Sequence, residues 1–227
     1  MIGTPRVHFR LTDSTNERAK ELAAAGAPHG TLVTADEQSA GRGRQGRSWS
    51  APARSAVLMS LVTRRLPATL PLAAAVAICE ALPVRCQIKW PNDIWLERRK
   101  LAGILVEGRP QEGWAVLGIG LNVTTEAFPL ELDGTATSLR LKGIETSTEA
   151  VLASLLDSLD EWLEAPDEAV LAAWRERDAL RGERVRWTGG EGTAEGIDAS
   201  GALIVATGSG RVTLDAGEVH LLTGDRA

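Results

Sequence analysis

The order of hydrophobic and polar residues predicts a mixture of strands and helices in the first half of the chain. Short stretches rich in Val, Thr, Ile and Leu that alternate with polar residues are typical of strands. Two longer runs, residues 14–25 and 68–82, have the spacing or the alanine content of helices. The predicted strands are residues 7–11, 30–35, 55–63, 85–90, 94–96, 100–107 and 114–123.

The second half of the chain changes character twice. Residues 124–143 lack a regular pattern and predict a mobile loop, and helices are expected at 148–163 and 166–180. Beyond Gly182, short β-like stretches alternate with Gly-rich turns. The change predicts a large domain, residues 1–180, and a small β domain, residues 181–227, which is marginal alone and should pack on the larger one. The β-like stretches are residues 184–187, 192–197, 202–206, 211–214 and 218–222.

The composition is that of an ordinary globular protein, with 227 residues, 44% hydrophobic and 24% charged. Neither a signal peptide nor a run long enough to cross a membrane is recognisable, so we expect a cytoplasmic protein without membrane association. The formal charge of -5 disfavours DNA binding by the protein as a whole. Cys79 and Cys86 have no CxxC spacing and no nearby histidine, so buried thiols are predicted rather than a zinc site or disulfide.

Residues 41–49, GRGRQGRSW, contain three arginines, three glycines and no acidic residue. Glycine lets the backbone approach a ligand closely, and the planar guanidinium of arginine suits phosphate and carboxylate oxygens. The segment connects two predicted strands, and a long connection of this kind is either functional or disordered. It is therefore either a solvated basic loop or a loop that becomes ordered on an anion.

Other polar segments accompany this loop. Ser14-Thr15-Asn16 begins the first predicted helix, where Ser14 and Glu17 fit a capping box, although a helix N-terminus also offers N–H groups to a ligand. Gln38 follows a predicted strand. Three further segments each have a simple explanation when taken singly. KWPND at residues 89–93 fits a tight turn, the lysine of KLAGIL at 100–105 fits a solvated hairpin residue, and GIGLN at 118–122 fits a buried strand.

In this combination and order, the segments resemble the catalytic domain of biotin protein ligases, also called biotin–[acetyl-CoA-carboxylase] ligases. GIDASGALIV, residues 196–205, is similar to the C-terminal domain of that family, so the resemblance covers nearly the whole chain. It implies an α+β fold in which helices pack on a mixed sheet of the class II synthetase-like type. Residues 1–180 would form the biotin- and ATP-binding catalytic domain, and residues 181–227 a small SH3-like β-barrel.

The family implies a reaction in two steps. Biotin and ATP form biotinyl-5′-AMP and pyrophosphate, and a lysine of the biotin carboxyl carrier domain of an acyl-CoA carboxylase then takes the biotinyl group as an amide. Because the first step joins two anions, cations must offset the charge that develops on the phosphoryl oxygens. The resemblance implies that Lys100, Arg42 and Arg44 supply this charge, and that the glycine-rich loop closes over the adenylate and shields it from water.

The resemblance also assigns the binding residues. Hydroxyl and amide side chains suit the neutral ureido ring of biotin, and Trp49 is expected to stack on adenine. Magnesium is expected to arrive with the nucleotide, with Asp93 as a candidate ligand. The implied biotin-binding residues are Ser14, Thr15, Asn16, Gln38, Gly41, Arg42, Gly43, Arg44 and Lys100. The implied nucleotide-binding residues are Arg47, Trp49, Asn92, Asp93 and Asn122.

Two features depart from some members of the family. Gln45 replaces a basic residue of the loop, and the catalytic pattern starts within about fifteen residues of Met1, so that a DNA-binding domain and a repressor function are not expected. A monomer and a homodimer both remain open. The alternatives are a lipoate ligase, which shares the architecture, and a non-enzymatic binder of single-stranded nucleic acid that stacks bases on tryptophans. Placement of four of the seven tryptophans within predicted strands and helices disfavours the second; they are Trp90, Trp114, Trp162 and Trp174.

Overall fold

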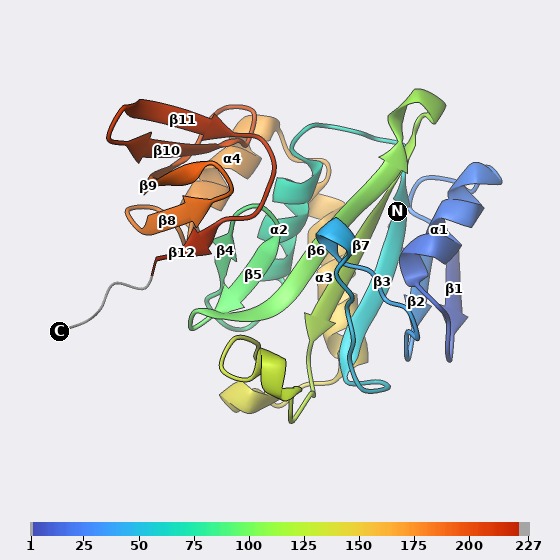
Figure 1. Ribbon diagram of the computed structural model, residues 1–227. Coiled ribbons are helices and arrows are strands. Elements are labelled where there is room, and N and C mark those ends of the chain that lie inside the picture. Colours follow the sequence, from blue (N-terminus) through green and yellow to red (C-terminus); the bar gives the residue numbers. More distant parts are fainter. Residues whose placement is uncertain (1, 223–227) are drawn as a thin grey trace.

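A seven-stranded sheet forms the centre of the protein in the computed structural model, which describes residues 2–222 (Figure 1). Its strand order is β1-β2-β3-β7-β6-β5-β4. The β1 and β2 strands are parallel and all other neighbours are antiparallel, so the predicted mixed sheet is confirmed. The strands are β1 (Arg6–Phe9), β2 (Leu32–Ala35), β3 (Ala56–Thr63), β4 (Gln87–Lys89), β5 (Asp93–Leu96), β6 (Arg99–Arg109) and β7 (Trp114–Asn122).

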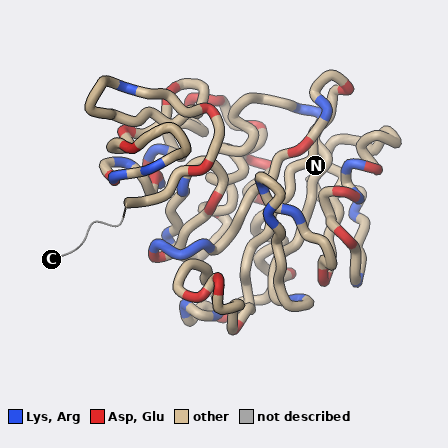
Figure 2. The backbone as a smooth tube through the Cα atoms, in the orientation of Figure 1, with Lys and Arg blue, Asp and Glu red and all other residues tan. Residues whose placement is uncertain are grey.

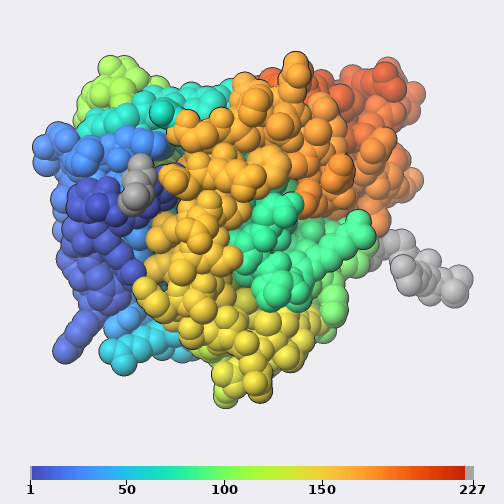
Figure 3. All heavy atoms as spheres, turned by 180° about the vertical axis from the view of Figure 1, so that it is seen from behind, coloured from blue at the N-terminus to red at the C-terminus, as the bar shows by residue number. Residues whose placement is uncertain are grey.

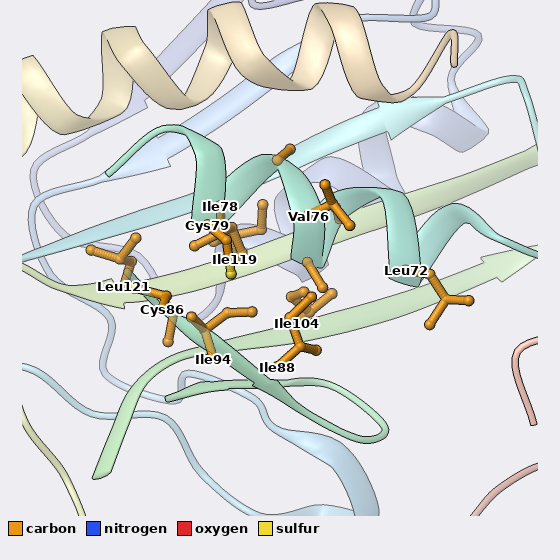
Figure 4. Close-up of a cluster of buried hydrophobic side chains, with 14 of the residues drawn as sticks. Leu72, Val76, Ile78, Cys79, Cys86, Ile88, Ile94, Ile104, Ile119 and Leu121 are labelled. Carbon is orange, nitrogen blue, oxygen red and sulfur yellow. The ribbon is translucent and has the colours of Figure 1, made fainter. Parts of the chain in front are cut away.

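One face of this sheet is closed by helices. The α2 helix (Leu70–Glu80) is apolar around almost its whole circumference because it lies between the sheet and α3 (Thr148–Trp162). Figure 4 shows Val76 and Ile78 of α2 near Ile104 of β6 and Ile119 of β7, with the thiols of Cys79 and Cys86 in the same core. The view from behind shows α3 and α4 (Asp167–Arg175) covering this side (Figure 3). Both cysteines are buried and free, as predicted.

The opposite face is only partly covered. The α1 helix (Thr15–Ala24) packs its Ala19 and Ala23 against Val33, Val62 and Val116 at one side of the sheet. Alternate residues of a strand point to opposite faces, so the GIGLN pattern of β7 sends Ile119 and Leu121 into the core. Glycines face the other way along the middle of β6 and β7, which leaves this part of the sheet without side chains; they are Gly103, Gly118 and Gly120.

The segment 124–143 is irregular, as its sequence suggested, but it is tied to the sheet. Lys100 donates its backbone N–H to the carbonyl of Thr135 at 2.8 Å, and the N–H of Thr137 donates to the carbonyl of Lys100 at 2.9 Å. Leu139 is fully buried and anchors the far end. Its two short 3₁₀ turns are η3 (Leu130–Leu132) and η4 (Arg140–Lys142). Neither has a periodic spacing of hydrophobic residues, so the sequence pattern did not indicate that this segment is ordered.

The C-terminal strands form an antiparallel sheet with the order β11-β10-β9-β8-β12. Two backbone hydrogen bonds of Ile88, to Arg177 at 2.7 Å and from Ala179 at 2.9 Å, join the chain before this sheet to β4. Val185 and Leu203 enter the same core as α2, which confirms the expected packing. The strands are β8 (Arg184–Trp187), β9 (Gly190–Ile197), β10 (Leu203–Thr207), β11 (Gly210–Leu214) and β12 (His220–Leu221).

Within residues 2–222, every helix is too short or too polar to cross a lipid bilayer.

Candidate functional site

A cavity lies over the glycines of β6 and β7. The N-terminus of α1 borders it on one side, and the Arg/Gly segment, residues 41–49, crosses in front (Figure 1). Residues 217–220, which lead into β12 of the C-terminal sheet, close another side. Segments that are far apart in the sequence therefore meet at this cavity.

A network of polar side chains occupies the α1 end of this cavity. Thr15 donates its backbone N–H and its hydroxyl to Oε1 of Gln38, at 2.7 and 3.0 Å. Ser60 of β3 contacts Thr15 Oγ1 at 2.8 Å and donates to Asn16 Oδ1 at 2.6 Å. These groups carry no net charge and hold each other in fixed directions, so they form a preorganised surface for a neutral hydrogen-bonding ligand.

The capping box expected at the start of α1 is not formed. Ser14 is the N-cap residue by backbone conformation, but its side chain makes no capping hydrogen bond. Glu17 pairs instead with Lys20 at 2.7 Å and with Arg42. Ser14 lines the cavity, and the Glu17 carboxylate pairs with a lysine of the same helix and an arginine of the Arg/Gly segment instead of with the backbone N–H of Ser14.

The Arg/Gly segment folds into a narrow hairpin. Gly43 donates its N–H to the carbonyl of Arg47 at 2.7 Å, and Trp49 donates to the carbonyl of Gly41 at 2.9 Å. At the tip, η1 (Arg44–Gly46), Gln45 and Gly46 have φ of 55° and 75°. A left-handed turn of this kind suits glycine and disfavours residues with a Cβ.

Trp49 anchors the hairpin on the floor of the cavity. A Cβ added to Gly120 would lie 2.4 Å from Cε2 of Trp49, and one added to Gly103 would lie 3.2 Å from Cζ3. The indole therefore occupies the space that these two glycines leave on the sheet. Gly41 does not line the cavity; a Cβ there would lie 2.3 Å from the carbonyl oxygen of Trp49, so this glycine permits the hairpin to close.

The three arginines of the hairpin point to different partners. Arg42 contacts Glu17 and lies 3.5 Å from Oε1 of Glu107. Arg44 lies at the cavity and donates to Oδ1 of Asn92 at 3.3 Å. Arg47 contacts Glu218 next to the C-terminal sheet. The arginines of this segment are drawn blue at the centre of Figure 2.

Lys100 and Asp93 form an ion pair at the edge of the same cavity. Lys100 Nζ is 2.6 Å from Asp93 Oδ1 and 5.8 Å from the centre of the Trp49 ring. Asp93 begins β5, and Lys100 lies opposite Trp95 beside a register shift in the β5–β6 pairing. Both side chains line the cavity. Asn92 is held by a bond from its Nδ2 to the carbonyl of Ile104 at 2.8 Å.

Two predicted residues do not line the cavity, Gly41, described above, and Asn122. Asn122 is buried, and its Nδ2 donates to the carbonyl of Thr137 at 3.1 Å, which secures the segment 124–143. Every other residue proposed from the sequence, Gly41 excepted, lines the cavity; these are Ser14, Thr15, Asn16, Gln38, Arg42, Gly43, Arg44, Arg47, Trp49, Asn92, Asp93 and Lys100.

Sequence reasoning gave no role to Lys89, although it is the first residue of KWPND. Its side chain lines the cavity, and Nζ lies over the ring of Trp95 at 5.3 Å from the centroid. Burial lowers the pKa of Lys89, and nearby Lys100 lowers it further, whereas Asp93 opposes the shift. A cation placed here at a cost in hydration suggests an anionic ligand.

Ser60, Glu107 and residues 217–220 were also missed. Ser60 and Glu107 were hidden because each stands inside an ordinary strand pattern, AVLMSLVT and RKLAGILVEGR, where a polar residue is expected to face solvent. The C-terminal residues lie far along the chain, and only the packing of the second sheet brings them to the cavity.

The carboxylates near the cavity are engaged by cations rather than gathered together. Within residues 2–222, no three His, Cys, Asp or Glu side chains are arranged to hold a metal ion.

Both parts of the chain are similar in sequence to known proteins. Residues 8–123 match the Biotin/lipoate A/B protein ligase family, and residues 182–222 match the Biotin protein ligase C terminal domain. The biotin–[acetyl-CoA-carboxylase] ligase of Mycobacterium tuberculosis is 37% identical over 92% of this chain and 86% of its own length. The enzyme of the same name from Paracoccus denitrificans is 36% identical over 92% of this chain and 97% of its own.

The fold agrees with these sequence matches. The structure of biotin protein ligase from Aquifex aeolicus in complex with biotin and ATP superposes with a TM-score of 0.85 and 27% identity, covering 96% of this chain and 99% of that one. Sequence, both sheets and the cavity thus lead to the same assignment, and the chain belongs to the biotin protein ligase family.

Proposed function

We propose that this protein is a biotin–[acetyl-CoA-carboxylase] ligase, which activates biotin with ATP and transfers it to a lysine of a biotin carboxyl carrier domain. The observation that carries the proposal is the division of one cavity into two parts. A neutral network around Asn16 and Gln38 lies at one end, and the cations Lys100, Arg44 and Lys89 line the other. This arrangement suits a ligand with a neutral ring and an acid group that meets a phosphate.

The neutral end is proposed to bind the ureido ring of biotin. Ser14, Thr15 and Asn16 are each at most 4% exposed. Thr15 and Asn16 are fixed by their protein partners, whereas Ser14 Oγ and Gln38 Nε2 have no hydrogen-bond partner among the described residues and could meet a ureido group, which offers both donors and an acceptor. Gln38 and the backbone of Gly43 complete this end.

The cationic end is proposed to bind the reacting groups. Lys100 would contact the carboxylate of biotin and the α-phosphate together, which offsets the repulsion between two anions and holds them for reaction. Asp93 keeps the Lys100 ammonium in place through the ion pair at 2.6 Å. Arg44 and Lys89 would neutralise the remaining phosphoryl oxygens, with Arg47, Asn92 and Trp49 on the nucleotide side.

In the first step, a carboxylate oxygen of biotin forms a bond to the α-phosphorus of ATP, and the bond from that phosphorus to the bridging oxygen of pyrophosphate breaks. In the second step, the neutral amine of the carrier lysine forms a bond to the acyl carbon, AMP leaves, and the amine gives up a proton. The cations stay in position through both steps and stabilise first pyrophosphate and then AMP as leaving groups.

ATP is proposed to enter as its magnesium complex. Asp93 lines the cationic end of the cavity, and it already pairs with Lys100. Because no cluster of three ligating side chains occurs in the described part of the chain, the phosphates of ATP would supply most of the oxygen ligands that magnesium prefers.

Two other functions fit less well. A lipoate ligase would use the same architecture, but its substrate has no ureido ring to meet the neutral polar end formed by Ser14, Asn16 and Gln38. A binder of single-stranded nucleic acid would need exposed tryptophans for stacking. Trp90, Trp114 and Trp174 are instead buried in the core.

The function is tested by incubating the protein with biotin, MgATP and a candidate carrier domain and measuring the intact mass of the carrier. A gain of one biotinyl group on the carrier lysine is expected. Biotin-dependent exchange between ATP and pyrophosphate reports the first step alone. Exchange that depends on lipoate but not on biotin would overturn the assignment.

Lys100→Ala is expected to lower biotin-dependent exchange by at least about 100-fold, the usual size of the loss of one charge-stabilising group, without changing the far-UV circular dichroism spectrum. Arg42→Ala and Arg44→Ala are expected to slow adenylate synthesis or to increase the release of biotinyl-AMP. Unchanged synthesis and release in both arginine variants would make the hairpin a solvated connection only.

A further inference from the structure

We propose that Glu107 of β6 is a positioning residue that links the biotin-binding amide of Asn16 to the Arg/Gly hairpin. This inference rests on the proposed function and goes beyond it, because Glu107 lies outside the cavity lining. One carboxylate would then serve both the substrate-binding group and the hairpin that covers it.

The first half of the link is the contact between Glu107 and Asn16. Asn16 Nδ2 donates to Glu107 Oε2 at 3.0 Å, while Asn16 Oδ1 accepts from Ser60 at 2.6 Å. The amide is therefore held at both of its polar atoms, and it is only 4% exposed. A group held in this way binds a ligand without first losing rotational freedom.

The second half is the contact between Glu107 and the hairpin. Glu107 Oε1 lies 3.5 Å from Arg42 Nη2, and Glu17 contacts the same guanidinium. Lys20 bridges the two carboxylates, at 2.7 Å from Glu17 and 3.6 Å from Glu107. Two acids and two bases thus form a cluster at the edge of the cavity, with Arg42 in the cavity lining and Glu107 outside it.

The burial of this cluster suits a reversible latch. The side chain of Glu107 is 23% exposed and that of Arg42 is 48% exposed. Ion pairs that water reaches are weak one by one, so the hairpin can open to admit substrates, while several pairs together favour the closed position. Opening would withdraw Arg42 from Glu107 without breaking a buried charge pair.

Sharing one carboxylate couples the two events. Biotin bound to Asn16 favours the orientation in which the Asn16 amide donates to Glu107. In the same orientation Glu107 can also contact Arg42 of the hairpin. The hairpin should therefore close more readily over bound biotin or biotinyl-AMP. Loss of the Glu107 charge is expected to weaken biotin binding and adenylate retention, and to leave the chemistry at Lys100 largely intact.

The test is Glu107→Gln, which keeps the shape and an acceptor for Asn16 but removes the charge that faces Arg42. We expect the KM for biotin in pyrophosphate exchange to rise about fivefold, as for loss of one charged partner. The release of biotinyl-AMP in the absence of carrier should rise by a similar factor, with kcat within about twofold of the wild-type value. Glu107→Gln should add little to the release already caused by Arg42→Ala.

Glu112→Gln is the matched control, because Glu112 follows β6, pairs with Arg109 at 2.8 Å and belongs to none of the contacts of Arg42 or Asn16 described above. It should behave as wild type. If the wild-type enzyme is active, and Glu107→Gln has the same biotin KM and the same adenylate release as wild type, the role of Glu107 is overturned and the proposed function stands. A change in thermal stability without either kinetic change would do the same. A wild-type protein without biotin-dependent exchange would overturn the proposed function as well.

Discussion

The Asn16 amide occupies the space next to Gly118, where a side chain would otherwise lie. A Cβ at position 118 would lie 2.1 Å from Asn16 Oδ1, and the amide has no free direction to move in because Ser60 and Glu107 hold it. Gly118→Ala should therefore turn Asn16 out of its position. We expect the KM for biotin in pyrophosphate exchange to rise about tenfold, equivalent to about 1.4 kcal/mol of binding free energy.

Gly208→Ala is the control for this substitution, because a Cβ there would meet nothing within 4 Å. The control variant should keep the wild-type KM. A wild-type KM in Gly118→Ala would mean that Asn16 is not needed in its present orientation, and it would remove this residue from the proposed biotin site.

Lys89 shows a conflict between stability and function at the level of one residue. Its pKa is lowered, chiefly by burial, so the charged form is disfavoured in the folded protein. A group with a lowered folded pKa contributes stability above its ordinary pKa and loses that contribution as pH falls through the folded pKa. At pH 7, Lys89→Met should thus unfold at the same temperature as wild type or a higher one, and the gain should shrink toward pH 10.

The same variant should lose activity if Lys89 meets the phosphates. We expect pyrophosphate exchange to fall at least about tenfold, in line with the loss of one charged contact to a phosphoryl group. Lys142→Met provides the comparison, because Lys142 pairs with Glu97 at 2.5 Å and does not line the cavity. Exchange within about twofold of wild type in Lys89→Met would limit this lysine to packing on Trp95.

At the scale of elements, the strands and helices were predictable because each has one dominant pattern. The apolar run of α2 and the alternation of GIGLN in β7 follow directly from what they contact. The cavity residues Lys89 and Ser60 were not predictable in the same way. Their neighbours come from other elements, so their environment depends on packing that no local pattern records.

The N-terminus of α1 shows the same limit from the other side. The spacing of Ser14 and Glu17 fits a capping box, and the local rule is sound for an isolated helix. In the folded chain Glu17 meets Lys20 and Arg42, and a charged partner from a distant hairpin outweighs a backbone N–H. A local motif was therefore replaced by a tertiary contact at the functional site.

The Arg/Gly hairpin provides a prediction at this scale. Its three arginines are sites for trypsin, and its partners Glu17, Glu107 and Glu218 lie on three separate parts of the protein. Biotin and MgATP together should slow cleavage in the hairpin by at least about fivefold, because a covering loop is protected when the ligand beneath it holds it closed.

Arg98 gives an internal control, since it is at the exposed turn between β5 and β6 and pairs with Glu183 away from the cavity. Cleavage there, followed by mass spectrometry of the peptides, should not respond to the ligands. Equal rates in the hairpin with and without ligands would show that it does not act as a cover.

For the whole molecule, the position of the C-terminal sheet matters because residues 217–220 border the cavity. The junction runs through Ile88, whose backbone bonds to Arg177 and Ala179 on either side of Asp178. Trp90, in the same segment as Lys89 and Asp93, donates Nε1 to the carbonyl of Gly201 at 3.0 Å. The KWPND segment is thus held from both sheets, and a loosened junction should disturb the cationic end of the site.

Asp178 allows this junction to be tested by pH. Its Oδ1 accepts from the backbone N–H of Leu180 at 2.8 Å, while Oδ2 is buried without a partner among the described residues. Burial raises the pKa of Asp178 despite the backbone donors. A group with a raised folded pKa contributes stability that is present below its ordinary pKa and is lost as pH rises through the folded value.

Asp178→Asn keeps the acceptor for Leu180 and removes the charge. The free energy of unfolding of the variant, relative to wild type, should therefore rise as pH increases above about 4, the ordinary pKa of an aspartate, with a gain on the order of 1 kcal/mol once the wild-type carboxyl is ionised. Urea unfolding at several pH values measures this difference. A difference that does not change with pH would mean that the Asp178 carboxyl titrates normally, and the junction would then owe its strength to the backbone bonds of Ile88 and the apolar contacts of Val185 and Leu203 alone.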